Sequence, residues 1–181
     1  LRLKAESRFT RAASGGTGSA KTSGNYAPTL WPMASAAAEG FDQILWLDAQ
    51  EHTFAEEAGQ MNIFFRIGDE VVTPELSGTI LPGVTRESAL KLLEDWGVNA
   101  GTRRISMEEL ARASEDGSLL EIFGAGTAAV IASVASISYL GKEISAAPPS
   151  SGSLAERLRE ELLGIQYGER QDPHNWTHVV G

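Results

Sequence analysis

The stretch MNIFFRIGDEVVT, residues 61–73, restricts the possible folds more than any other part of this sequence. Two apolar segments, 61–67 and 70–73, are separated by Gly68 and Asp69, a pair typical of the two-residue turn between antiparallel strands. The aromatic and β-branched residues in both segments also favour strands. We therefore predict a β-hairpin, which argues against a purely helical bundle.

The other predicted elements alternate between strands and helices. Apolar runs at 43–48 and 129–140 are predicted strands, and the chain opens on alternating apolar and polar residues, as if it entered in the middle of a strand. Strands that neighbour each other in sequence, mixed with helices, favour an α/β fold of the mixed α+β kind, with helices packed on a mixed sheet. The 181 residues fit one domain, which we expect to be cut from a longer protein.

Three helices are marked by periodicity or by their ends. In residues 85–97 the apolar side chains recur at the i, i+3, i+4, i+7 spacing of an amphipathic helix. Two serines are each followed, three residues later, by a glutamate, and this capping-box pattern lets each side chain satisfy the backbone N–H of the other residue. Residues 146–153 are a predicted loop before the last helix. The residues predicted to start or end helices are Gly97, Ser106 with Glu109, Gly117, Ser153 with Glu156, and either Gly164 or Gly168.

Charge and composition exclude several classes of binding partner. A net charge of −9, from 24 acidic and 15 basic residues, gives no basic surface for a nucleic acid. The absence of cysteine excludes disulfides and thiolate metal sites and suits a reducing cytoplasm. No apolar run approaches the roughly 20 residues that span a bilayer, so we expect a cytoplasmic protein without a membrane partner. The histidines 52, 174 and 178 show no ligand spacing, and no metal is predicted.

Lys21 lies in the glycine-rich stretch GGTGSAKTSGNYAP, residues 15–28. Residues 15–22 differ only at Ala20 from the phosphate-binding pattern G-x-x-x-x-G-K-[ST], and the apolar run ending at Asp48 is compatible with the magnesium-holding strand of a nucleotide hydrolase. A phosphate-binding loop must leave a buried strand and open a helix at once, however, and here the preceding segment is alternately polar while Gly24 and Pro28 follow. A P-loop nucleotide hydrolase is therefore the alternative from a different class.

A second interpretation makes Lys21 the nucleophile toward an aldehyde cofactor, which requires groups for the cofactor's phosphate, ring nitrogen and phenolic oxygen. Two separate loops are candidates for the phosphate: 81–88, at a helix N-terminus, and 123–130, where glycines let the backbone approach closely. Glu56 and Glu57 precede an apolar strand, where a carboxylate can face a ring nitrogen. Tyr26 is close enough in sequence to reach the phenolic oxygen.

Four segments resemble, in order and spacing, the large domain of branched-chain amino acid aminotransferases, fold type IV enzymes that use pyridoxal 5'-phosphate. These segments are GGTGSAKTSGNYAPTL, EEAGQMNIFF, ILPGVTRESAL and FGAGTAAV. The ending GIQYGERQDPHNWTHVV also resembles that family and separates it from D-amino acid aminotransferases and aminodeoxychorismate lyases, which are the alternatives within the fold. The resemblance implies a pseudo-barrel flanked by helices.

The resemblance also implies an activity and an organisation. The activity is transfer of an amino group between L-leucine, isoleucine or valine and 2-oxoglutarate. Residues 1–181 are expected to form the large cofactor-binding domain, without the small N-terminal domain that carries the family's phosphate-binding arginine. The active sites of the family lie near a subunit interface, so a homodimer is expected.

A role for each site residue follows from the same resemblance. Lys21 forms a Schiff base with the cofactor and then moves a proton between the substrate's α carbon and the cofactor. Glu57, not Glu56, pairs with the ring nitrogen, and Tyr26 hydrogen-bonds the phenolic oxygen. Gln60 stands where some relatives use a threonine. The remaining implied residues are Val84, Thr85 and Thr127 at the phosphate, Arg11 in support of the cofactor, and Ala128 with Gln60 at the substrate carboxylate.

Overall fold

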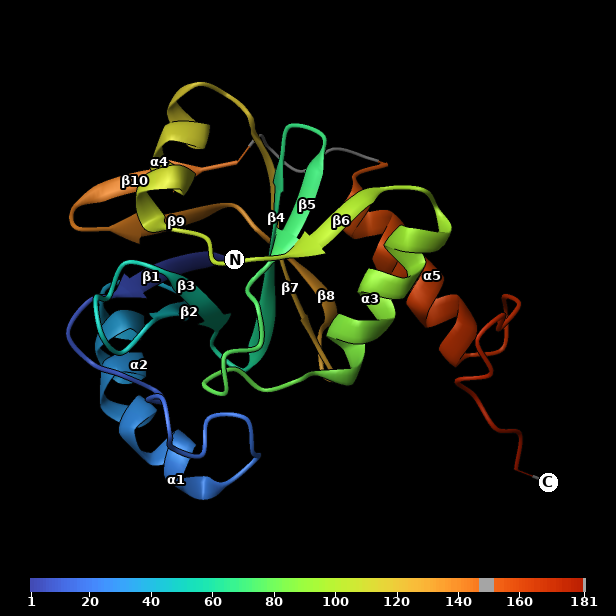
Figure 1. Cartoon of the computed structure of the whole chain (residues 1–181), viewed down its shortest axis with the longest axis horizontal. Helices are drawn as coiled ribbons and strands as arrows, with labels where there is room; N and C mark the ends of the chain where they lie inside the picture. Colours follow the sequence, from blue (N-terminus) through green and yellow to red (C-terminus); the bar gives the residue numbers. More distant parts are fainter. Residues whose placement is uncertain (147–151, 181) are drawn as a thin grey trace.

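The computed structural model describes residues 1–146 and 152–180 and shows a mixed sheet with helices packed on it (Figure 1). The mixed α/β fold predicted from the sequence is confirmed. The predicted loop at 146–153 falls mostly outside the described residues. The strands are β1 (Arg2–Glu6), β2 (Gln43–Leu47), β3 (Ala55–Ala58), β4 (Met61–Ile67), β5 (Glu70–Thr73), β6 (Asn99–Thr102), β7 (Leu119–Gly126), β8 (Val130–Val134), β9 (Ser136–Tyr139) and β10 (Lys142–Ser145). The helices are α1 (Ser23–Tyr26), a 3₁₀ turn η1 (Ala27–Thr29), α2 (Leu30–Ala38), α3 (Val84–Asp95), α4 (Met107–Glu115) and α5 (Leu154–Gln166).

Strand β4 is at the centre of the sheet. On one edge, the start of β4 pairs with β3 and its end pairs with β5. On the other edge, β4 pairs with β7 along residues 62–67. All three pairings are antiparallel. The β4–β5 hairpin is confirmed, and Gly68 in its turn has φ 57°, a conformation that favours glycine. Parallel pairs join β1 to β2 and β9, and β5 to β6, which makes the sheet mixed.

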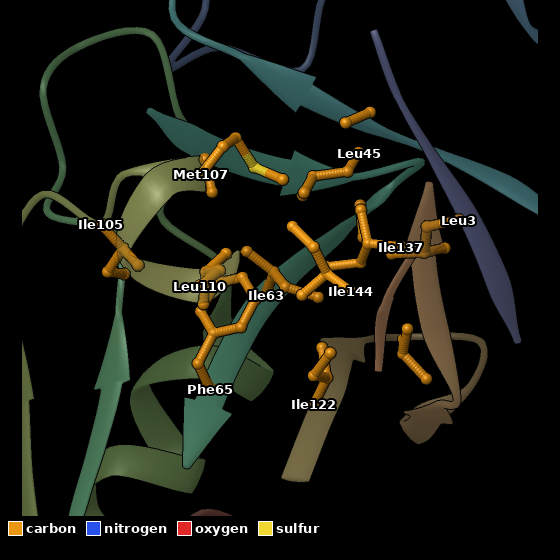
Figure 2. Close-up of a cluster of buried hydrophobic side chains, with 14 of the residues drawn as sticks. Leu3, Leu45, Ile63, Phe65, Ile105, Met107, Leu110, Ile122, Ile137 and Ile144 are labelled. Atoms are coloured by element: carbon orange, nitrogen blue, oxygen red, sulfur yellow. The ribbon is translucent and has the colours of Figure 1, made fainter. Parts of the chain in front are cut away.

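Both faces of β4 are buried, each in its own core. Ile63 and Phe65 belong to a core that also takes side chains from β1, β2, β9, β10 and α4. Figure 2 shows part of this core. Phe64, on the opposite face, stacks on Phe123 of β7 with ring centroids 5.0 Å apart. Its core is covered by α3 and α5, which lie side by side (Figure 1). The sheet therefore separates two hydrophobic layers.

The helix signals are confirmed only in part. α3 is present, and Gly97 after it has φ 68°. Ser106 and Ser153 accept hydrogen bonds from the N–H groups of Glu109 and Glu156, as predicted. The reciprocal half of each capping box was wrong: the Glu109 carboxylate binds Arg103, and the Glu156 carboxylate accepts from the N–H of Gly152. Charged or loop donors nearby thus compete successfully for the glutamates.

The ends of the last two helices were also tested. Gly117 follows α4 with φ 78°, as predicted. Gly164 lies inside α5, and the helix ends before Gly168, which has φ 71°. An added Cβ at Gly164 would lie 2.6 Å from Arg170 Cδ, so this glycine makes room for a side chain instead of ending the helix.

Several strands differ from the prediction. The run 129–140 forms two strands, β8 and β9, which have different partners: β8 pairs with β7, and β9 pairs with β1 and β10. Glu56 and Glu57, placed before a strand by the sequence, lie inside β3. Across the described ranges 1–146 and 152–180, none of the helices combines the length and apolarity required to cross a bilayer.

Candidate functional site

The Lys21 loop, residues 7–22, connects β1 to α1 without regular structure and is tied to α1 by one asparagine. Asn25 is 4% exposed, and its side-chain amide donates to the carbonyl oxygens of Thr17 and Ala20, each at 2.7 Å. The Thr17 hydroxyl donates in turn to the Asn25 amide oxygen at 2.7 Å. These bonds fold the loop back on α1 and fix the stretch that leads into Lys21.

The same geometry argues against the phosphate-loop alternative. β1 ends at Glu6, so a long irregular segment separates the strand from the glycines. α1 has only four residues, Ser23–Tyr26, and continues into a 3₁₀ turn that contains Pro28. A nucleotide hydrolase needs a strand, a tight loop and a full helix in direct succession, and these residues do not provide that arrangement.

One cavity of about 410 Å³ brings most of the predicted site residues together. They come from the Lys21 loop, α1, the β3–β4 turn, the start of α3 and the β7–β8 turn. Lys21 is itself exposed to solvent at the edge of this cavity. The predicted residues that line the cavity are Lys21, Tyr26, Gln60, Val84, Thr85, Thr127 and Ala128.

One end of the cavity suits an anion. α3 begins after Gly83, and none of the side chains in residues 1–146 and 152–180 caps its N-terminus, which leaves the N–H groups of Val84 and Thr85 available to donate. Thr85 is therefore inside the helix and is not its cap. A Cβ on Gly83 would lie 2.2 Å from the amide oxygen of Asn62, so a side chain there would displace the Asn62 amide. The Thr127 hydroxyl, from the β7–β8 turn, lines the same cavity.

The β7–β8 turn is followed by a strained residue. Val130 has φ 56°, a left-handed conformation that is rare for a β-branched residue and costs on the order of 1–3 kcal/mol. Its side chain is 8% exposed and belongs to the core under α3 and α5. Burial of this side chain thus offsets the strain and holds the turn with Thr127 and Ala128 in place.

Glu57 lines a second, smaller hollow whose wall is partly shared with the cavity. This second hollow, of about 20 Å³, shares Tyr26 and Gln60 with the first and is also lined by Arg11 and Glu57. The Arg11 Nε and a Glu57 carboxylate oxygen form an ion pair at 3.3 Å, and the N–H of Leu81 donates to the other oxygen. Burial raises the pKa of Glu57 to about 7, although Arg11 and the Leu81 N–H oppose this shift.

Glu56 lies on the other side of β3 and does not line either hollow. Its carboxylate accepts a hydrogen bond from the Thr79 hydroxyl at 2.5 Å, and it faces a separate cavity of about 280 Å³. Burial also raises the pKa of Glu56. The alternation of side chains along β3 therefore directs Glu57, and not Glu56, toward Tyr26.

Other lining residues were not predicted from the sequence. Gln43, at the start of β2, lines the larger cavity, and its side-chain oxygen is buried without a hydrogen-bond partner among the described residues. Asn62 donates from its side-chain amide to the Leu81 carbonyl at 2.9 Å and so holds the β5–α3 loop. A glutamine beside an apolar strand has no sequence feature that would identify it as a site residue. Asn62 could have been identified only because it lies within one of the segments that resemble the family.

The mixed sheet carries a cavity lined by a lysine and by an uncapped helix N-terminus, and a buried carboxyl lines the smaller hollow that shares part of its wall. This combination of groups suits a phosphorylated, nitrogen-containing ring. Comparison with known families agrees. The family described as Amino-transferase class IV matches residues 2–137, and this chain belongs to that family.

The individual relatives that resemble this chain are named as branched-chain enzymes of the family. The chain is 46% identical to "Branched-chain-amino-acid transaminase 1" of Bacillus subtilis over 180 residues, which cover 99% of this chain and 51% of the relative. The structure of the branched-chain amino acid aminotransferase from Escherichia coli superposes with a TM-score of 0.81 at 26% identity, covering 97% of this chain and 56% of that one. The branched-chain amino acid aminotransferase of T.th., solved with pyridoxamine 5'-phosphate, gives a TM-score of 0.78 at 29% identity, with 97% and 54% covered. The chain therefore spans about half the length of these relatives.

Proposed function

We propose that residues 1–181 are the large cofactor-binding domain of a branched-chain amino acid aminotransferase. The protein would use pyridoxal 5'-phosphate to transfer an amino group between L-leucine, isoleucine or valine and 2-oxoglutarate. The observation that carries this proposal is that Lys21, the start of α3 and the β7–β8 turn line one cavity. The relatives named for this reaction, and the one solved with pyridoxamine phosphate, support the substrate class and the cofactor.

The residues of the cavity fit this cofactor from end to end. Val84 and Thr85 at the uncapped helix N-terminus, with Thr127, would hold the phosphate through N–H and hydroxyl donors. Glu57, with Arg11 behind it, would face the ring nitrogen. Gly83 leaves the space that a side chain would fill, because its Cβ would collide with Asn62.

Each residue then has a distinct chemical task. Bound pyridoxal phosphate supplies an electron-withdrawing ring that acidifies the substrate's α C–H bond. The Lys21 amine would hold the cofactor through its aldehyde carbon and, once released by the substrate's own amine, would serve as the base for the α proton. Glu57 keeps a proton on the ring nitrogen, and the Tyr26 hydroxyl orients the phenolic oxygen. The Ala128 N–H and the Gln60 side chain bind the substrate carboxylate.

The attachment of the cofactor is tested by replacing Lys21. In the intact protein, Lys21→Ala should abolish the visible absorption that borohydride removes, whereas Lys142→Ala, at an exposed lysine of β10, should retain it. Mass spectrometry of the reduced wild type should locate one phosphopyridoxyl group on Lys21. The same absorption in Lys21→Ala as in the wild type would refute the assignment.

The role of Glu57 is tested by Glu57→Gln, which keeps the shape of the side chain but cannot hold the ring nitrogen protonated. Exchange of the substrate α proton should slow by roughly 10²-fold or more, since proton-positioning groups typically contribute 10²–10⁴-fold. Wild-type exchange rates would show that another group protonates the ring. Keto acid formed from D- instead of L-amino acids would replace the proposed substrate class with that of the D-amino acid enzymes.

We also propose that the intact protein is a cytoplasmic homodimer. Leu30 and Trp31, adjacent on the first turn of α2, are 70% and 72% exposed. Such large apolar side chains are typical of interfaces. Sedimentation should give twice the monomer mass, and Trp31→Glu should lower it. A wild-type protein that sediments as a monomer would contradict this part of the proposal.

A further inference from the structure

Thr79, in the loop between β5 and α3, contacts three parts of the candidate site. Its hydroxyl donates to a carboxylate oxygen of Glu56 on β3 at 2.5 Å. Its carbonyl oxygen accepts a hydrogen bond from the Arg11 guanidinium. Gly18 of the Lys21 loop packs against its backbone so closely that a Cβ there would lie 2.5 Å from the Thr79 carbonyl oxygen. Thr79 therefore joins β3, the Lys21 loop and the β5–α3 loop.

The direction of the hydrogen bonds at Thr79 follows from counting protons. Glu56 as a carboxylate can only accept, so the single proton of the Thr79 hydroxyl points to Glu56. The Ser77 hydroxyl, 2.7 Å from that of Thr79, must then be the donor of their bond. Glu56 and Thr79 are 6% and 5% exposed, whereas Ser77 lies at the surface. Water can therefore replace Ser77, whereas the Thr79–Glu56 bond joins two nearly buried residues at the wall of the 280 Å³ cavity.

Thr79 is linked to the partners of both Glu57 carboxylate oxygens. One oxygen is paired with Arg11, and the same guanidinium is anchored by the Thr79 carbonyl. The other oxygen accepts from the N–H of Leu81, two residues after Thr79 in the same loop. A displacement of Thr79 therefore moves the partners of both Glu57 oxygens together, without any contact between Thr79 and the larger cavity.

We propose that Thr79 and Glu56 are positioning residues: Glu56 fixes the Thr79 hydroxyl, and the Thr79 backbone fixes Arg11 and Leu81 against Glu57. Glu56 thus has a function distinct from that of Glu57. The catalytic consequence rests on the proposed function, because Glu57 matters for catalysis only if it faces the cofactor. The positioning itself is a property of this chain alone.

The test uses hydrogen exchange at the Leu81 amide in the cofactor-free full chain. Thr79→Val removes the hydroxyl and keeps the shape of the side chain, so exchange at Leu81 should rise roughly tenfold, in line with the loss of one buried hydrogen bond. Thr79→Ser keeps the hydroxyl and should restore slow exchange, and Ser77→Ala is the matched control. Glu56→Ala removes the acceptor from the other side and should have the same local effect as Thr79→Val. Amides of β4 should exchange as in the wild type in all four variants.

In the intact protein, Thr79→Val should lower kcat for L-leucine roughly tenfold with little change in KM, and Thr79→Ser should recover it. Unchanged Leu81 exchange in both Thr79→Val and Glu56→Ala, or faster exchange that is equally large in β4, would overturn the inference. Failure of the proposed function is a separate result: Lys21 would then carry no cofactor while Leu81 still responds to Thr79→Val.

Discussion

Gly18 is the glycine whose replacement most directly tests how the Lys21 loop is held. A Cβ at this position would lie 2.5, 2.6 and 2.7 Å from the carbonyl oxygen, Cα and carbonyl carbon of Thr79. Ordinary contacts between non-bonded carbons are about 3.5–4.0 Å, so the loop or the Thr79 backbone must move by about 1 Å. Both groups are backbone, which cannot turn aside as a flexible side chain does.

The size of the effect follows from this clash. Gly18 is not among the glycines with positive φ, so alanine meets no conformational penalty and the whole cost is overpacking. Overpacking costs typically 1–3 kcal/mol, which for a domain of this size lowers Tm by roughly 2–12 °C. The Lys21 loop should also loosen, and cofactor affinity should fall with stability.

The assay is urea unfolding of Gly18→Ala beside Gly24→Ala. Gly24 lies in α1 with nothing within 4 Å of an added Cβ, so alanine there should be neutral or slightly stabilising. The midpoint should fall for Gly18→Ala with an unchanged m value, and it should not fall for Gly24→Ala. Equal midpoints for the wild type and Gly18→Ala would refute the reasoning that the loop and Thr79 are packed backbone to backbone.

Two further predictions concern stability. The pKa of Glu57 rises from 4.5 to about 7 on folding, so the folded state holds its proton more tightly than the unfolded state. Stability of the cofactor-free chain should therefore fall, by roughly 3 kcal/mol, as pH rises between these values, and Glu57→Gln should flatten that part of the profile in denaturant titrations at several pH values; an unaltered profile would contradict it. Ser106→Ala, which removes the cap of α4, should cost about 1 kcal/mol by the same measurement, while Ser106→Thr should cost less, and equal losses would show that the cap is unimportant.

The sequence predicted those elements whose signals are local. The hairpin at Gly68 and the helix α3 follow from turn chemistry and apolar spacing within a few residues, and both are present. Strand β3 was missed because its four residues, AEEA, carry none of the side chains that favour strands. Its two glutamates are buried because Arg11 and Thr79, distant in sequence, supply partners. Such pairings are decided by the tertiary structure.

In the candidate site, too, the residues within motifs were predicted and those placed by the tertiary structure were not. The grouping of Lys21 with the start of α3 and with the β7–β8 turn was expected from the motifs, and all three line one cavity. The roles assigned to these residues remain predictions. Gln43 was not expected, because its position depends on where β2 begins beneath the β3–β4 turn. Motifs thus identify the groups that contact a ligand more readily than the residues that complete the walls.

Because Ile63, Phe64 and Phe65 are all apolar and both faces of β4 are covered, sliding this strand by one position would exchange one hydrocarbon side chain for another. Hydrophobic burial alone therefore hardly distinguishes the native register of β4 from the shifted one. What discriminates is polar and local: the tight bend at Gly68 and the amide of Asn62 held by the Leu81 carbonyl. We expect variants weakened at those two points to stay collapsed and helical while the residues that line the cavity fall out of alignment, so that ligand binding is lost before the fold is.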